Sequence, residues 1–301
     1  MAETMQARNG ANPASAWLLP GASLATHPPA SRGIPRIIHQ TFSTRSRMPA
    51  VLEENCRAIE ALNPDFTYRF YDDHDRERLI GEIYGEAILA RYRRIDPAYG
   101  AARADLFRYL CIYHFGGVYL DVKVGVTRPL SDVLRDDDAY LLSQWDHGPG
   151  SPHAGWGTHR QLAGIPGGEF QQWHVIASPG HPFLAAVIAA VLNNIDRFDP
   201  FAFAHPWEAV ICTTGPVVYT TSIHPILATH PHRRLVGSEE IGLRYSLFDG
   251  SADPDAHRRL YRDYRKAETP LIRQSFPLSL LWPVLNLARK VARRLRGLLR
   301  R

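Results

Sequence analysis

The sequence predicts an α/β fold, and three observations favour it. Between residues 34 and 275, short apolar runs with strand spacing alternate with segments of helical spacing, the pattern of a sheet flanked by helices. The 301 residues are 45% hydrophobic and 22% charged, which is enough for a core without disulfides or structural metal. No internal repeat or low-complexity linker interrupts 34–275, so we expect one main domain there.

The beginning of the chain differs from this stretch. Residues 1–32 are rich in Ala, Pro, Ser and Gly and have no apolar period, which predicts a flexible leader without a secretory signal. The apolar run at 34–40 then follows a glycine and includes a proline, and it predicts a buried first strand. His39 and Gln40 end this run, either near a bound ligand or making local hydrogen bonds.

The next elements follow from spacing. Apolar residues at helical intervals predict a helix over 50–62. Aromatic residues alternate with polar ones at 66–70, which predicts a second strand. Residues 146–168 are rich in Gly, His and Pro and predict a long loop of the kind that often carries function.

The most informative segment is a helix followed directly by a strand. Residues 101–115 have helical spacing, and the pair Gly116-Gly117 supplies a left-handed stop. From 118 to 124, apolar residues alternate with polar ones, which predicts a strand.

Polar groups of this helix and strand are expected to converge. Asp105 and Arg108 are three residues apart and share one helix face, and Tyr119, Asp121 and Lys123 would share one side of the strand. Such a cluster suits a phosphorylated ligand, because Arg and Lys neutralise phosphate and carboxylates can hold Mg²⁺ or Mn²⁺. The same spacing also fits an ordinary surface ion pair on the helix, with Asp121 as a cap at the end of the strand.

Charge is distributed unevenly. The net charge is +5, but 289–301 contains seven basic residues and no acid, so the rest of the chain carries −2. The body is therefore not a nucleic-acid-binding surface. Residues 277–301 have an apolar stripe and a basic face, which predicts an amphipathic helix. This helix would lie on an anionic membrane surface or pack on the domain. No apolar run is long enough to predict a transmembrane helix.

Four blocks together resemble glycosyltransferase family 32. They are IPRIIHQ at 34–40, the run ADLFRY followed by GGVYLD within 104–121, ASPGHPF at 177–183, and TTGP at 213–216. The family pattern runs approximately Ser-Asp-x-x-Arg-Tyr, then Gly-Gly-x-Tyr-x-Asp-x-Asp. The resemblance covers about 34–225 and implies a GT-A-like nucleotide-sugar-binding fold with a mixed, mostly parallel sheet. It also implies a nucleotide-diphospho-sugar donor and retention of the anomeric configuration.

The resemblance also implies roles for particular residues. It makes Asp105, Arg108 and Asp121 the catalytic candidates, with the first two holding donor sugar hydroxyls and Asp121 serving as the metal ligand. The donor-binding candidates are His39, Gln40, Gly117, Tyr119, Lys123, Thr214 and Gly215. The segment around Thr214 also fits a plain turn.

One position departs from the family pattern. The second Asp of the Asp-x-Asp motif is Lys123, and a charged lysine cannot ligate a cation. Mn²⁺ or Mg²⁺ could still bind through Asp121, the donor diphosphate, waters and another carboxylate. Alternatively, the ammonium could offset the diphosphate charge and weaken the need for metal.

The resulting functional hypothesis is a retaining hexosyltransferase, with mannose as one candidate sugar, acting on a lipid-linked or cell-envelope glycan. It would lie in the cytoplasm or on the inner face of the membrane, in a bacterial cell if the strong arginine bias reflects a GC-rich genome. The alternatives are a nucleotide-sugar hydrolase and a catalytically degenerate protein that binds glycan or membrane.

Overall fold

The computed structural model describes residues 33–249 and 263–277, together with 251, 253, 256, 260, 279–282 and 284–288. The predicted leader at 1–32 and the basic run at 289–301 lie outside the described residues. Of the predicted helix at 277–301, residues 279–282 and 284–288 are described and are helical. Within these ranges, no helix is long and apolar enough to cross a membrane.

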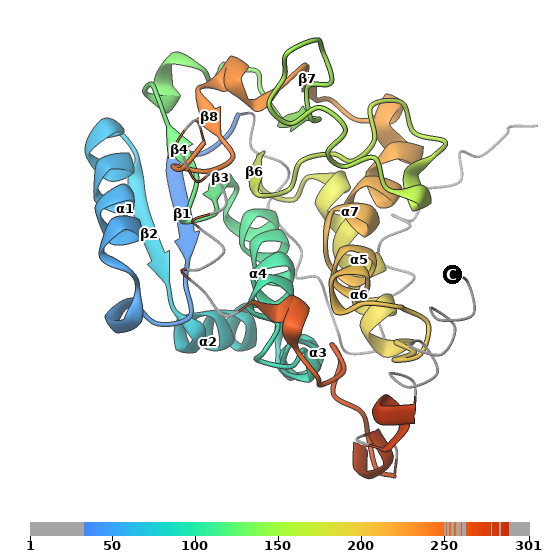
Figure 1. The fold of residues 1–301 in the computed structure, drawn as a ribbon. Helices are drawn as coiled ribbons and strands as arrows, with labels where there is room; N and C mark the ends of the chain where they lie inside the picture. The colour runs from blue at the N-terminus through green and yellow to red at the C-terminus, as the bar shows by residue number, and fades with distance from the viewer. Residues whose placement is uncertain are drawn as a thin grey trace, which may run out of the picture.

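A six-stranded sheet lies at the centre of the molecule, with the strand order β2-β1-β3-β6-β5-β7 (Figure 1). Its strands are β1 (Ile37–Thr41), β2 (Thr67–Tyr71), β3 (Gly117–Leu120), β5 (Tyr140–Ser143), β6 (His174–Ala177) and β7 (Arg233–Leu235). Only β6 runs against the other five, so the sheet is mixed and mostly parallel. A second, two-stranded sheet pairs β4 (Gly125–Val126) with β8 (Leu243–Arg244).

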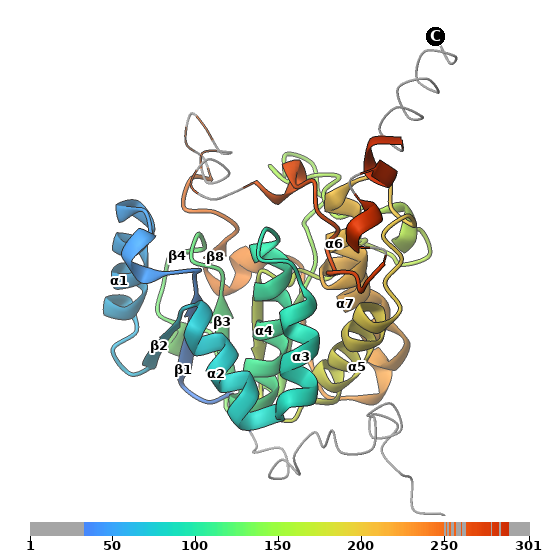
Figure 2. The same ribbon diagram turned by 90° about the horizontal axis from the view of Figure 1, so that it is seen from below.

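Helices cover both faces of the large sheet, as Figures 1 and 2 show. They are α1 (Ala50–Leu62), α2 (Asp73–Tyr84), α3 (Glu86–Arg94), α4 (Gly100–Phe115), α5 (Pro182–Asp196), α6 (Pro206–Thr213) and α7 (Pro216–Ile223). One hydrophobic cluster packs the helices from α2 through α7 against one face of the sheet. Two further clusters pack α1 and the small sheet on the opposite face. The predicted α/β class and flanking helices are therefore confirmed.

Most predicted elements agree with the structure to within a few residues. The helix over 50–62 is α1, the helix over 101–115 is α4, and the strand at 66–70 is β2 shifted by one residue. The first strand begins later than expected, at Ile37. Residues 146–168 form a loop with one short 3-10 helix, Arg160–Leu162.

The predicted strand over 118–124 is wrong beyond Leu120. The backbone turns after β3, because the amide of Val124 donates to the carbonyl of Asp121 at 2.9 Å. The side-chain amide of Asn55 on α1 then donates to the carbonyls of Val122 and Val124, both at 2.9 Å. A side chain therefore satisfies backbone groups that a neighbouring strand would otherwise pair. The alternating apolar residues are buried in this turn, which explains why the pattern looked like a strand.

The helix α4 crosses the interior between the sheet and α5 (Figure 2). Residues on all its sides are buried, as expected of a helix that is apolar all round in its second half. It ends at Phe115, and it is followed by Gly116, with φ of 64°, and Gly117, with φ of 96°. A Cβ at Gly117 would lie 2.5 Å from the carbonyl oxygen of Ile37, so only glycine lets β3 start this close to β1. This reversal fixes α4 relative to the end of β3.

Candidate functional site

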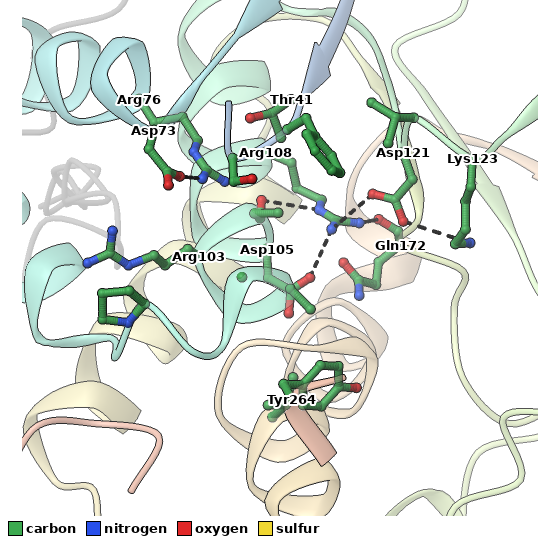
Figure 3. A pocket seen from close by; sticks show the side chains of 18 of the residues that line it. Thr41, Asp73, Arg76, Arg103, Asp105, Arg108, Asp121, Lys123, Gln172 and Tyr264 are labelled. Carbon is green, nitrogen blue, oxygen red and sulfur yellow. Dashed lines mark hydrogen bonds and ion pairs between the residues drawn. The ribbon is translucent and has the colours of Figure 1, made fainter. Parts of the chain in front are cut away.

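A cavity of about 740 Å³ opens at the carboxyl ends of β1 and β3 (Figure 3). This is the edge of an α/β sheet at which ligands commonly bind. The first two turns of α4 form one wall, and the segments after β1 and β3 form another. Because β6 runs in the opposite direction, its beginning lies at the same edge, which brings Gln172 to the cavity.

Arg108 joins two carboxylates at the cavity wall. Its Nη2 lies 3.0 Å from Oδ1 of Asp105, one turn earlier on α4, and 3.2 Å from Oδ1 of Asp121, just after β3 (Figure 3). The convergence predicted between the helix and the end of the strand is therefore present. The interpretation of an exposed helix ion pair fails, because the side chains of Asp105 and Arg108 are each only 3% exposed.

The guanidinium of Arg108 is held in place from several sides. Its Nη1 donates to the carbonyl of Gln172 at 2.5 Å, and Nε donates to the carbonyl of Ala104 at 3.3 Å. It also lies over the ring of Tyr119, 4.7 Å from the ring centroid. Burial alone would lower the pKa of Arg108, but the neighbouring Asp121, Tyr119 and Asp105 raise it above its usual value. Arg108 is therefore a fixed positive charge.

Asp105 is buried and has an unusual pKa. Its Oδ2 accepts a hydrogen bond of 2.9 Å from the hydroxyl of Thr214, which precedes α7. Burial raises the pKa of Asp105 to about 6, although Arg108 and Thr214 both act to lower it. The carboxylate is thus mostly ionised at neutral pH and becomes protonated under mildly acidic conditions.

Asp121 and Lys123 stand on the turn after β3. Oδ1 of Asp121 accepts a hydrogen bond of 3.1 Å from the hydroxyl of Tyr119, and Oδ2 lies 4.0 Å from Nζ of Lys123. The backbone of Asp121 is also held, because the side-chain amide of Gln40 donates to its carbonyl at 3.4 Å. The ammonium of Lys123 donates to the carbonyl of Tyr245 at 3.1 Å.

We tested whether these residues fit a divalent cation, which glycosyltransferases with an Asp-x-Asp motif generally use. Within the described residues, no group of three or more His, Cys, Asp or Glu side chains could hold a metal ion. Asp121 already faces a cation at each oxygen, Arg108 at 3.2 Å and Lys123 at 4.0 Å. A divalent cation about 4 Å from the ammonium would be repelled by roughly 8 kcal/mol at an effective dielectric constant of about 20. The residues present therefore do not fit a metal held by this motif.

The structure divides the predicted site residues into two groups. Those that line the cavity are Asp105, Arg108, Tyr119, Asp121 and Lys123. Those that do not line it are His39, Gln40, Gly117, Thr214 and Gly215. Three of the second group support the first by contact: Gln40 holds the backbone of Asp121, Thr214 holds Asp105, and Gly117 allows the turn from helix to strand.

His39 belongs to the core. It is fully buried, and burial lowers its pKa to about 3, helped by the charge of Arg69. Its Nε2 lies 3.1 Å from the carbonyl of Gly116, and Nδ1 lies 3.0 Å from the hydroxyl of Tyr71. A neutral ring that donates from Nε2 and accepts at Nδ1 satisfies both contacts. Of the two interpretations of His39, local hydrogen bonding is the one that the geometry supports.

Sequence reasoning missed several residues that line the cavity. Gln172 carries no motif and reaches the site only because β6 is reversed. Arg76 pairs with Asp73 at the start of α2, and only this ion pair, not the position of Arg76 at the cavity, follows from their spacing of three residues on a helix. Arg103 also lines the cavity, although its position on α4 predicts that it points away from Asp105. Its guanidinium does point away from Asp105 (Figure 3) and contacts Glu77 at 3.6 Å.

Comparison with known proteins finds several similar fungal proteins. The chain is 30% identical over 188 residues to inositol phosphoceramide mannosyltransferase 3 of Schizosaccharomyces pombe, covering 62% of this chain and 44% of that protein. It is 29% identical over 190 residues to a mannosyl phosphorylinositol ceramide synthase of Saccharomyces cerevisiae, covering 63% and 42%. It is 23% identical over 202 residues to the initiation-specific alpha-1,6-mannosyltransferase of Schizosaccharomyces pombe, covering 63% and 48%.

The chain spans less than half the length of these three fungal relatives. Among solved structures, the PaToxG glycosyltransferase covers 80% of this chain and 88% of its own, with a TM-score of 0.43 and 12% identity.

A family model matches the middle part of the chain. The model described as "glycosyltransferase sugar-binding region containing DXD motif" matches residues 50–141. The matched residues include Asp105, Arg108, Tyr119, Asp121 and Lys123, all of which line the cavity. Residues 50–141 therefore match this sugar-binding region, and in this chain Lys123 stands where the DXD motif has its second Asp.

Proposed function

We propose that the protein is a GT-A-like glycosyltransferase that transfers a hexose from a nucleotide-diphospho-sugar to a glycolipid or glycan acceptor. The observation that carries the proposal is the buried Asp105–Arg108–Asp121 bridge in the wall of the cavity, inside the region that the family model matches. Mannose is the first sugar to test, because the three relatives are named two mannosyltransferases and one mannosyl phosphorylinositol ceramide synthase.

The charge of the cavity supports an anionic donor. Among the residues that the structure describes, six cationic side chains line it, against four carboxylates, which leaves an excess of two positive charges. The cations are Arg47, Arg76, Arg103, Arg108, Lys123 and Arg265, and the carboxylates are Asp73, Asp105, Asp121 and Asp263. A nucleoside diphosphate has the opposite charge and fits a volume of about 740 Å³, within the range usual for small-molecule sites.

Different residues of the cavity would bind the sugar and the diphosphate of the donor. Asp105 faces the cavity with a carboxylate that can accept hydrogen bonds from sugar hydroxyls, and Arg108 fixes its orientation. Lys123 and Arg108 supply positive charge for the diphosphate. In the transfer, the bond from sugar C1 to the β-phosphate oxygen breaks, and its electron pair leaves with the nucleoside diphosphate. The acceptor oxygen bonds to C1, and its proton passes to the leaving phosphate oxygen.

Retention of configuration is part of the proposal. Each of the four carboxylates that the described part of the chain brings to the cavity has an arginine partner: Asp73 pairs with Arg76, Asp105 and Asp121 with Arg108, and Asp263 with Arg265. Asp105 has a pKa suited to a general base, but Arg108 and Thr214 hold its two oxygens. In the proposed transfer with retention, the acceptor gives its proton to the leaving phosphate oxygen, so no carboxylate is needed as a general base.

We further propose that the C-terminal segment holds the protein at an anionic membrane surface on the cytoplasmic side, close to a lipid-linked acceptor. The described part of this segment exposes four large apolar side chains, Leu280, Leu281, Val284 and Leu287. The seven basic residues at 289–301 follow directly. Exposed apolar residues beside a basic run are typical of a helix that lies in the membrane interface.

The test is a panel of nucleotide sugars, including GDP-mannose, UDP-glucose and UDP-galactose, measured for binding by calorimetry and for nucleotide release. We expect one of them to bind and to release nucleoside diphosphate, faster when a glycolipid acceptor is present. Asp121→Asn should abolish release, whereas Asp137→Asn, at an exposed position outside the cavity, should not. Release that never transfers sugar to an acceptor would favour a hydrolase, and binding without release would favour a degenerate binding protein.

A further inference from the structure

Compared with the Asp of the family motif, Lys123 changes the charge at its position by two units, the charge that a divalent cation would supply. In the family motif this position holds an Asp, with one negative charge, and here it holds a Lys, with one positive charge. The difference of two charges equals that of one Mg²⁺ or Mn²⁺ ion. With Lys123 in place, the two carboxylates Asp105 and Asp121 face the two cations Arg108 and Lys123, and the cluster is neutral before any ligand binds.

The ammonium of Lys123 has a fixed position. It lies 3.3 Å from the centroid of the Tyr245 ring, 6.0 Å from that of Trp173, and it donates to the carbonyl of Tyr245. The residue is 8% exposed, yet it lines the cavity beside Asp121. Aromatic faces stabilise a desolvated cation, so this lysine is held as a point charge at the wall rather than extended into water.

We propose that Lys123, together with Arg108, binds the donor diphosphate in place of a divalent cation, so that this glycosyltransferase binds and uses its donor without metal. This inference rests on the proposed function, since it concerns how the same cavity holds its donor. The negative charge on the leaving diphosphate grows as the C1–oxygen bond breaks. A preorganised ammonium and guanidinium stabilise that charge without a change in position.

The test measures nucleotide binding directly. Calorimetry with GDP, UDP, ADP and CDP is done on the full chain in excess EDTA and then in MnCl₂, with MnCl₂ alone as a further titration. Three proteins are compared: wild type, Lys123→Met and Lys123→Asp. Lys266→Met serves as the matched control, because Lys266 is exposed and does not line the cavity. Circular dichroism and thermal melting establish that each variant is folded.

We expect wild type and Lys266→Met to bind one nucleotide equally well in EDTA and in MnCl₂. Lys123→Met should bind it about 10- to 100-fold more weakly in both, the effect of losing one charged hydrogen bond. Lys123→Asp, which restores the family motif, should bind weakly in EDTA and regain affinity with MnCl₂. The same Asp variant should bind Mn²⁺ alone more tightly than wild type does.

The outcomes separate this inference from the proposed function. Nucleotide binding by wild type that requires Mn²⁺ would overturn the inference alone, and so would Lys123→Met binding as tightly as wild type in EDTA. If neither the nucleotides nor the nucleotide sugars bind under any condition, the proposed function fails and the inference with it. The comparison of wild type in EDTA and in MnCl₂ involves no variant, so a misfolded Lys123→Asp protein leaves the test decisive.

Discussion

Replacing Asp105 by Asn removes one charge from the donor site and keeps the shape of the side chain. The carboxylate contacts Arg108 at 3.0 Å and Thr214 at 2.9 Å, and an amide can meet both by turning its oxygen toward Arg108. What it loses is a charged acceptor for a sugar hydroxyl. Such a hydrogen bond contributes about 1.5–3 kcal/mol, so kcat/KM should fall roughly 10- to 100-fold.

The raised pKa of Asp105 also predicts how the stability of the protein depends on pH. In the folded protein the pKa of Asp105 is raised to about 6 from its ordinary value of 3.8. Between pH 3.8 and about 6, the carboxyl group of Asp105 is therefore protonated in the folded protein but ionised in the unfolded chain. The contribution of this group to the unfolding free energy therefore increases as the pH falls from above 6 toward 4, on the order of 3 kcal/mol. Asn has no such dependence. Above pH 6 the variant also avoids burying a charge, so it should melt no lower than wild type.

The assay is initial-rate nucleotide release across the pH range, with thermal melting at each pH. For wild type, kcat/KM should decline below about pH 6, about tenfold per unit, as Asp105 becomes protonated. Asp105→Asn should be slow at all pH values and lack this decline, and Asp137→Asn should behave as wild type. Full activity in Asp105→Asn, or a loss of activity matched by a loss of folding, would show that Asp105 supports the helix rather than the donor.

Three further predictions concern other parts of the chain. Arg108→Lys should lower kcat/KM at least about hundredfold and destabilise the fold by about 3–5 kcal/mol in urea unfolding, because an ammonium cannot bridge two carboxylates and a backbone carbonyl. Wild-type behaviour in either measurement would contradict the role of the bridge. His39→Asn should lower the unfolding free energy by about 1–3 kcal/mol and leave the KM for donor unchanged, since His39 lies in the core. A raised KM with unchanged stability would return His39 to the donor site. Deleting 289–301 should release the protein from phosphatidylserine vesicles in sedimentation at low salt, because each basic residue contributes about 1 kcal/mol near an anionic surface. Full-length protein that fails to sediment with such vesicles would exclude the membrane role.

Local patterns were sufficient to predict much of this fold. Helical spacing located α1 at its observed bounds, and the glycine pair located the turn between α4 and β3. The charged contact of Arg108 with Asp105 followed from a spacing of three residues on a helix. These predictions succeed because each depends on residues close together in the sequence.

The remaining features depend on contacts between distant segments. The end of β3 at Leu120 is set by Asn55, which binds the carbonyls of the following turn from a different helix. His39 looked like a ligand because it ends a strand, but the carbonyl of Gly116 and the hydroxyl of Tyr71 enclose it in the core. Nothing near Lys123 in the sequence shows that Tyr245 will cover it. Such pairings require the tertiary structure.

The reversed strand β6 has a consequence for how this site tolerates sequence change. It delivers the main-chain carbonyl of Gln172 to the guanidinium of Arg108, and that acceptor exists whatever side chain stands at 172. Point substitutions there can alter the contact between the Gln172 amide and Tyr109 but leave the carbonyl in position. An insertion or deletion in the loop from 146 to 171 would shift the path of the backbone itself. Alanine substitution at position 172 would therefore leave the contact with Arg108 in place, while changes in loop length a few residues upstream would disrupt it.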